Sequence, residues 1–84
     1  MGQEQTSLFD LQEIDTEEVR MILKEVSQSL TERGYNSINQ IVGYLISGDP
    51  GYISSYGDAR SKIQELDRAK IVEILLKEFQ KNNQ

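Results

Sequence analysis

With 84 residues and a formal net charge of −5, the chain is long enough for one domain and has no basic excess. It contains neither cysteine nor histidine, which excludes disulfides, thiolate zinc sites and cysteine nucleophiles. Without histidine the chain also lacks the commonest general base at neutral pH, and no pair of carboxylates has a spacing that indicates a catalytic site. We therefore expect that the protein is not an enzyme and binds no metal, cofactor or small-molecule substrate.

Residues 1–14 are polar and acidic and show no helical period, so we expect a flexible N-terminal arm. Most of the net negative charge lies in residues 1–15, because Glu4, Asp10, Glu13 and Asp15 are not balanced by any basic residue. The start has neither a basic run nor an apolar stretch, which predicts a cytoplasmic protein that does not contact a membrane. Residues 15–81 should form a single helical domain, with a frayed C-terminus at 82–84.

A first helix is expected at about residues 16–33. Asp15 and Glu18 have the spacing of a capping box at its start. An apolar stripe at intervals of three and four residues follows, and Gly34 ends it in a left-handed turn. The stripe consists of Val19, Ile22, Leu23, Val26 and Leu30.

A second helix is expected at about residues 37–47. Asn36 or Ser37 can cap its start, and Gly48 marks its end before the turn at Asp49-Pro50-Gly51. Gly43 lies inside this helix and costs about 1 kcal/mol relative to alanine. Its expected use is to let a neighbouring backbone pack closely.

Residues 51–57 are predicted to be a loop with a short helical turn. Asp58 is expected to cap a third helix that includes Ile63 and Leu66, and a fourth helix is expected at about residues 68–80. Asp67 either caps this fourth helix or lies within one continuous helix. The predicted fold class is therefore all-α, a small bundle of three to four helices.

The segment from Gly34 to Gly57 carries one formal charge, Asp49, and all four tyrosines. A small protein with 37% hydrophobic residues buries little surface by itself, so this segment is either core or contact surface, and a homodimer is expected. Asn39 and Gln40 either pair across the dimer axis or face solvent. The predicted interface residues are Tyr35, Ile38, Ile41, Val42, Tyr44, Leu45, Tyr52 and Ile53.

The residues from Gly34 to Arg60, GYNSINQIVGYLISGDPGYISSYGDAR, also carry a resemblance to a known family. The pattern NQIVGYL followed by SGDP resembles the IreB family of small Gram-positive bacterial regulatory proteins. The element from Ile63 to Arg68 and the N-terminal pattern Thr6-x-x-Phe9 are similar to that family as well. The resemblance covers nearly the whole chain.

This resemblance implies a short helical homodimer without catalytic activity. It also implies that the protein is a substrate of a membrane-anchored Ser/Thr kinase with PASTA repeats. The protein would then modulate cell-wall stress and cephalosporin resistance. Thr6 matches the phosphoacceptor threonine, whereas composition alone would make it an ordinary tail residue. The chain departs from the family at Ser37, where proline is usual, and at residues 54–57, which replace a basic loop.

The alternative function is a small helix–turn–helix nucleic-acid-binding protein, since the first two helices have suitable lengths. The helix at 37–47 contains no lysine or arginine, although phosphate contacts dominate such affinity. We therefore expect no nucleic-acid partner.

Overall fold

The computed structural model describes the backbone of residues 11–83 and the side chains of residues 16–83. Helix α1 (Leu11–Glu32) is followed by α2 (Ser37–Ser47), the short 3-10 turns η2 (Pro50–Tyr52) and η3 (Tyr56–Asp58), α3 (Ala59–Ile63) and α4 (Arg68–Asn82). Within residues 11–83 there is no β-strand. The predicted all-α class is confirmed.

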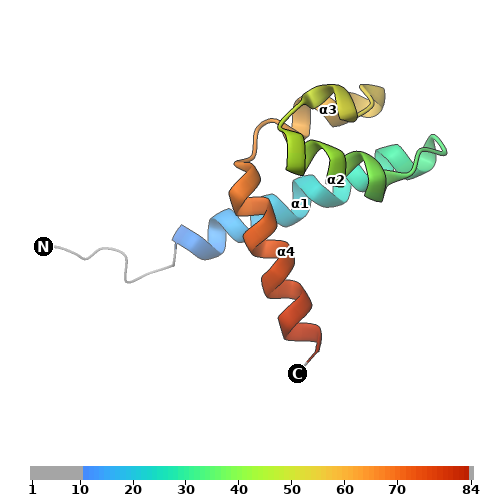
Figure 1. Ribbon diagram of the computed structural model, residues 1–84. Helices are drawn as coiled ribbons and strands as arrows, with labels where there is room; N and C mark the ends of the chain where they lie inside the picture. Colours follow the sequence, from blue (N-terminus) through green and yellow to red (C-terminus); the bar gives the residue numbers. More distant parts are fainter. Residues whose placement is uncertain (1–10, 84) are drawn as a thin grey trace, which may run out of the picture.

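The core lies where α1 meets α2 and α3. Figure 1 shows α2 and α3 on one side of α1, while α4 crosses α1 and its C-terminal half projects away from the body. Of the helix pairs, α1 and α3 make the most extensive contact. The buried side chains come from every α-helix and from the loop after η2, and they are Val19, Val26, Leu30, Tyr44, Ile53, Ala59, Ile63, Ile71 and Ile74.

Helix α1 begins earlier than its sequence predicts. Residues 11–14 are helical, so the boundary of the predicted arm is corrected, and residues 1–10 lie outside the described part of the chain. Asp15 is inside the helix and cannot be its N-cap. The end is as predicted, because Gly34 has φ 85° and donates its N–H to Thr31, while the N–H of Tyr35 bonds to Leu30.

Helix α2 has the predicted bounds and caps. The Asn36 side chain accepts a hydrogen bond from the Asn39 N–H at 3.0 Å, and Gly48 closes the helix with φ 78°. Another part of the chain packs closely against Gly43, as predicted, but it is a side chain. The Tyr52 ring lies there rather than a neighbouring backbone.

The two aspartates predicted to begin helices behave differently. Asp67 caps α4 by accepting a hydrogen bond from the Ala69 N–H at 3.1 Å, so α3 and α4 are separate helices. Asp58 precedes α3 but makes no side-chain capping bond, and its backbone is left-handed with φ 60°. The prediction of an Asp58 cap is therefore wrong, because Gly57 and Asp58 both have a left-handed backbone, whereas a capping residue is typically extended.

The C-terminal helix runs to Asn82, two residues beyond its predicted end and into the stretch predicted to fray. An arginine at its start joins it to α2: the Arg68 guanidinium donates to the Leu45 carbonyl at 3.1 Å. A cation at the C-terminal end of a helix is favourable. This contact places the first turn of α4 beside the end of α2.

Candidate protein-interaction surface

The predicted interface residues divide into core and surface. Tyr44 and Ile53 are 6% and 0% exposed, so both are enclosed by their own chain and cannot present a contact surface. Ile41 and Leu45 are half-buried and pack on the core. Ile38 and Val42 are 70% and 45% exposed on α2.

The two remaining tyrosines are exposed at other places. Tyr35 follows the end of α1, and Tyr52 packs beside Gly43. Neither side chain lines the apolar groove of α2 described next. The structure therefore does not gather all eight predicted residues on one face.

Helix α4 supplies an apolar surface that was not predicted. Leu75 lines a groove of about 200 Å³ together with residues of α1 and α2. The other lining residues are Leu23, Ser27, Ser37, Ile38, Ile41, Val42 and Leu45. One helical turn beyond the lining residues Val42 and Leu75, Ile46 on α2 and Phe79 on α4 are 80% and 63% exposed. We call the exposed set of Ile38, Val42, Ile46, Leu75 and Phe79 the α2–α4 surface.

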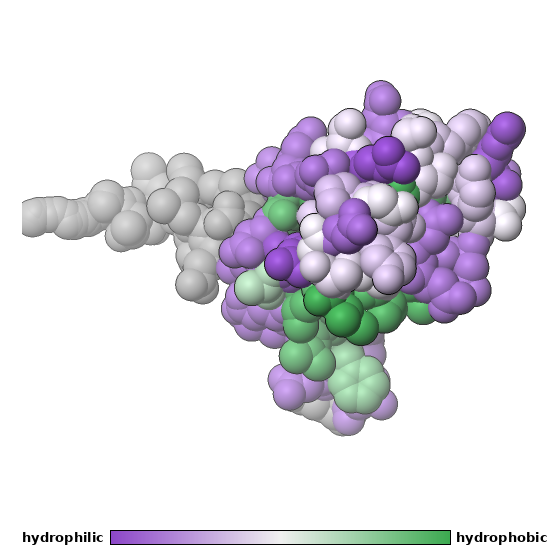
Figure 2. All heavy atoms as spheres, turned by 45° about the horizontal axis from the view of Figure 1, so that its top comes forward, coloured by the Kyte–Doolittle hydropathy of each residue, from purple (hydrophilic) through white to green (hydrophobic). Residues whose placement is uncertain are grey.

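Figure 2 shows hydrophobic residues gathered where α4 leaves the body and continuing along α4. Val72 and Leu76 extend the exposed apolar side chains of α4. Contiguous apolar surface of this kind on a small protein is typical of a contact with another molecule. The sequence itself indicates this surface, because α4 carries more apolar residues than one buried stripe requires, namely Ile71, Val72, Ile74, Leu75, Leu76 and Phe79.

The polar residues in the middle of the chain have local partners. The Gln40 side-chain oxygen accepts the N–H of Ser54 at 2.9 Å, which fastens the loop after η2 to α2. Asn39 is exposed. Gln40 thus bonds within its own chain. The exposure of Asn39 in the single chain is compatible with both predicted alternatives, pairing across a dimer axis and facing solvent.

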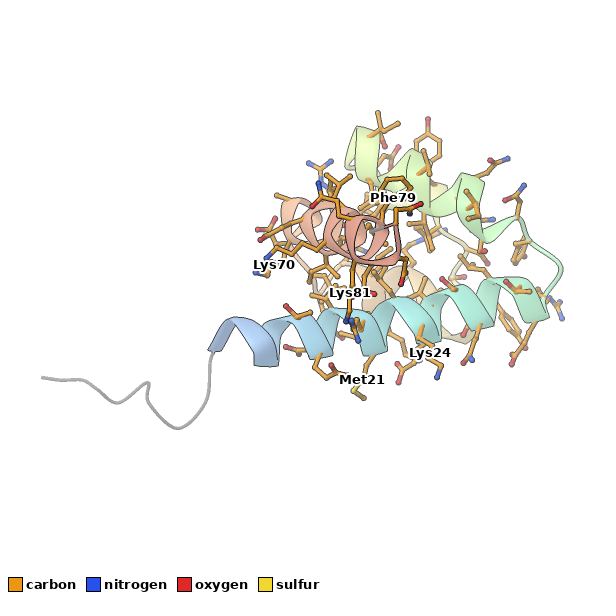
Figure 3. All side chains as sticks on the ribbon, turned by 90° about the horizontal axis from the view of Figure 1, so that it is seen from below. Met21, Lys24, Lys70, Phe79 and Lys81 are labelled. Atoms are coloured by element: carbon orange, nitrogen blue, oxygen red, sulfur yellow. The ribbon has the colours of Figure 1, made fainter. Side chains whose placement is uncertain are left out.

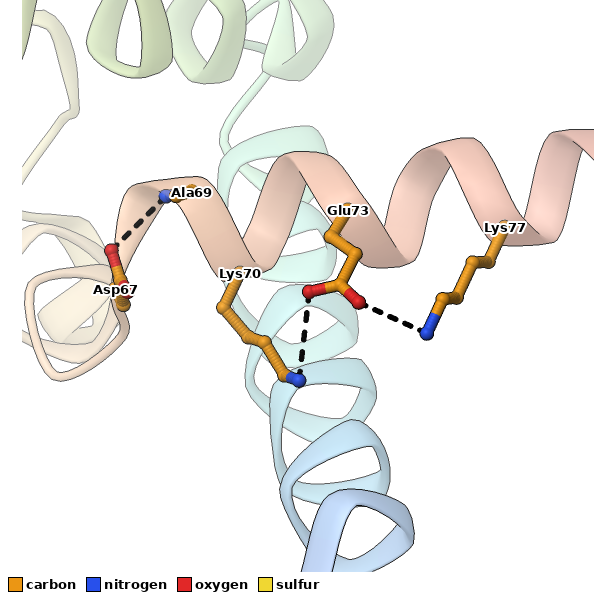
Figure 4. A network of polar contacts seen from close by, with 5 residues as sticks. All are labelled: Asp67, Ala69, Lys70, Glu73 and Lys77. Carbon is orange, nitrogen blue, oxygen red and sulfur yellow. Dashed lines mark hydrogen bonds and ion pairs between the residues drawn. The ribbon is translucent and has the colours of Figure 1, made fainter.

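The opposite side of α4 is charged. Figure 3 shows Phe79 on the side of α4 nearer α2, whereas Lys70 and Lys81 lie on the side nearer α1. Glu73 stands between two lysines, with 3.6 Å to the Lys70 ammonium and 3.0 Å to that of Lys77 (Figure 4). The hydrogen bond from Lys77 and the charge of Lys70 lower the pKa of the Glu73 carboxyl.

Nothing in the described part of the chain has the geometry of a metal site, because residues 16–83 contain no cluster of three potential ligands. Among the described helices, none is long and apolar enough to cross a membrane. Thr6, the predicted phosphoacceptor, lies outside the described residues.

The described structure is that of a small all-helical protein whose most prominent surface feature is apolar. Comparison with known families agrees with the sequence motifs: residues 4–81 match the family described as IreB regulatory phosphoprotein. The chain belongs to the IreB family, and its class is that of a regulatory phosphoprotein.

Proposed function

We propose that this protein is a non-enzymatic cytoplasmic regulator that acts through protein–protein contacts and is phosphorylated on Thr6 by a PASTA-type Ser/Thr kinase. Membership of a family of regulatory phosphoproteins supports the regulatory role. The match begins at residue 4, so it includes Thr6 and the Thr-x-x-Phe pattern. Modulation of cell-wall stress and cephalosporin resistance is the physiological setting that we propose.

The observation that carries the proposal of protein contacts is the α2–α4 surface. Ile38, Ile46 and Phe79 are among the most exposed large hydrophobic residues of the described chain. Ile38 lines the apolar groove, and Ile46 and Phe79 lie one helical turn beyond its lining residues Val42 and Leu75. We propose that a second copy of the chain covers this surface in a homodimer. A projecting helix whose apolar side lacks a partner within its own chain can gain that partner by reciprocal packing across a two-fold axis.

Two measurements test this proposal separately. Sedimentation of the purified chain at micromolar concentration should give a mass near twice 9.6 kDa, and a clean monomer would contradict the dimer. Incubation with a PASTA-type kinase and ATP should label the wild-type chain but not Thr6→Ala. Undiminished labelling of Thr6→Ala would place the acceptor elsewhere, with Thr16 or Ser7 as the next positions to test.

No structural observation favours the nucleic-acid alternative. Helix α2, the element that would enter a groove, has no basic residue and exposes Ile38, Val42 and Ile46 instead. Such side chains cannot neutralise phosphates. A gel-shift assay at low salt should show no retarded species.

A further inference from the structure

Helix α4 carries a stripe of lysines that does not belong to the α2–α4 surface. Lys70, Lys77 and Lys81 are separated by seven and four residues, so they lie along one side of the helix. Four basic and two acidic residues give α4 a net charge of +2 in a chain whose total is −5. We call Lys70, Lys77 and Lys81 the lysine face.

The lysine face lies toward the N-terminal half of α1. Lys70 lines a cleft with Glu18 and Val19 of α1, and further along α4 Glu78 pairs with Arg20. Figure 4 shows the N-terminal part of α1 passing on the side of α4 that carries Lys70 and Lys77. Figure 3 shows Lys81 on the side of α4 that faces α1 in that view, while Figure 1 shows the C-terminal half of α4 projecting away from α1. Residues 1–10 directly precede Leu11, the first residue of α1, and so connect to the N-terminal half of this helix.

The leader of residues 1–10 is long enough to meet the lysine face. From Leu11 to Arg20 the helix advances about 14 Å at 1.5 Å per residue. The five residues from Thr6 to Leu11 can span up to about 17 Å. The gap that remains between Thr6 and α4 is shortened by the long side chains of Lys77 and Lys81. Both lysines lie close to Glu78, which pairs with Arg20 of α1.

We propose that a phosphate on Thr6 docks on the lysine face of the same chain. This inference rests on the proposed phosphorylation of Thr6. The phosphate adds about −1.5 to −2 charges to a leader that already holds Glu4 and Asp10. The ligand is thus an intramolecular phosphothreonine, and the receptor is a set of three ammonium groups.

The tether makes a weak site sufficient. A short linker holds the phosphate at an effective concentration on the order of mM, so a lysine site with a dissociation constant in that range is about half occupied. Glu73 competes directly with the phosphate, since it pairs with Lys70 and Lys77. Glu18, Glu65 and Asp67 line the cleft at Lys70, so Lys77 and Lys81 are the lysines more open to a phosphate. A doubly charged phosphate competes with the single carboxylate of Glu73, whereas the unmodified Thr6 has no charge with which to compete.

The test uses the full chain with phosphothreonine installed at position 6 during synthesis, so that no kinase is involved. The chain lacks cysteine, so Gln3→Cys provides a unique position for a nitroxide spin label. In ¹⁵N NMR spectra the label should broaden the amides of residues 77–83 at least twofold more when Thr6 is phosphorylated. Raising the salt from 0.1 to 1 M shortens the Debye length from about 10 to about 3 Å, and should abolish the difference.

Two charge-neutralising variants make the test specific. The double variant Lys77→Gln/Lys81→Gln should lose the phosphate-dependent broadening. Lys62→Gln should retain it, because Lys62 lies on α3, where its ammonium is 3.5 Å from Glu25. Circular dichroism of each variant checks that the helices are intact, as expected for exposed positions.

Three results would overturn the inference. The first is equal broadening with and without the phosphate. The second is broadening that survives Lys77→Gln/Lys81→Gln. The third is broadening of an unlabelled ¹⁵N chain by a spin-labelled ¹⁴N phosphorylated chain that equals or exceeds the broadening within one chain, which would place the contact between molecules. A failure of the kinase to modify Thr6 would contradict the proposed function but would leave these spectra unchanged.

Discussion

The ring of Tyr52 lies directly against the backbone of Gly43 in the middle of α2. A β-carbon added at Gly43 would stand only 2.4 Å from Cδ1 of Tyr52 and 2.9 Å from its Cγ. The second distance shows that the base of the ring is involved and not only its tip. A side chain at position 43 would therefore displace the whole ring.

This contact predicts that the effect of Gly43→Ala depends on Tyr52. Alanine is the better helix former by about 1 kcal/mol, but in the intact protein it forces the ring away, so Gly43→Ala should lower the free energy of unfolding. In the Tyr52→Ala background the same change should raise it by about 1 kcal/mol. Urea unfolding of the wild type, the two single variants and the double variant, all at the same protein concentration, gives the coupling energy between positions 43 and 52. Equal effects in both backgrounds would show that the ring does not explain the glycine.

Ile53 should behave as a core residue although its segment was predicted to form a contact surface. It is 0% exposed, and its carbonyl accepts a hydrogen bond from the Arg60 side chain at 2.8 Å. Ile53→Ala should lower the free energy of unfolding by about 2–5 kcal/mol, and Ile53→Val should lower it by about 0.5–1.5 kcal/mol. Thermal unfolding measures both. A loss for Ile53→Ala below that expected for Ile53→Val would contradict the core assignment.

Asp67 and Asp58 offer a matched pair, because both precede a helix and only Asp67 caps one. Asp67→Ala should lower the free energy of unfolding by about 1 kcal/mol through loss of the cap. Asp58→Gly should raise it by up to about 1 kcal/mol, since glycine accepts the left-handed backbone without strain. Chemical denaturation measures both variants. A loss of stability in Asp58→Gly as large as that in Asp67→Ala would mean that the Asp58 side chain makes a stabilising contact.

The parts of this fold that the sequence could predict are those set by local chemistry. Gly34, Asn36 and Gly48 mark their helix boundaries because capping depends on a few adjacent atoms. Asp15 and Asp58 failed as caps for different reasons. Asp15 lies inside a helix that begins earlier, and Asp58 has a left-handed backbone and makes no capping bond.

The candidate surface could be predicted only in part, because apolar periodicity does not say which apolar side faces the core. Tyr44 and Ile38 belong to the same helix, yet one is buried and the other is exposed. Helix α4 shows the same difficulty, with Ile74 in the core and Phe79 on the surface. The packing of α4 across α1 decides this, and it involves residues too far apart in sequence for a local pattern to report.

Phe79 should contribute to the proposed dimer without supporting the core of its own chain. It is 63% exposed, so Phe79→Ser should leave the helical circular dichroism unchanged and weaken dimerisation at least tenfold, as expected for an aromatic residue at an interface centre. Met21→Ser is the control. Met21 is 58% exposed but points away from α2 and α4 (Figure 3). Sedimentation over a range of concentrations compares the two, and equal weakening by both would remove the α2–α4 surface from the interface.

Glu73 should titrate below the ordinary glutamate value of 4.5 because Lys77 and Lys70 stabilise its ionised form. A carboxyl with a lowered pKa in the folded state stabilises the fold at a pH above its unfolded pKa. This contribution is lost as the pH falls through the folded pKa. Lys77→Gln should therefore move the pKa of Glu73 upward, toward 4.5, as followed by ¹³C NMR of the carboxyl carbon. Lys62→Gln, on α3, should not move it. An unchanged pKa in Lys77→Gln would show that the two side chains do not pair in solution, and Lys77 would then be wholly available to a phosphate.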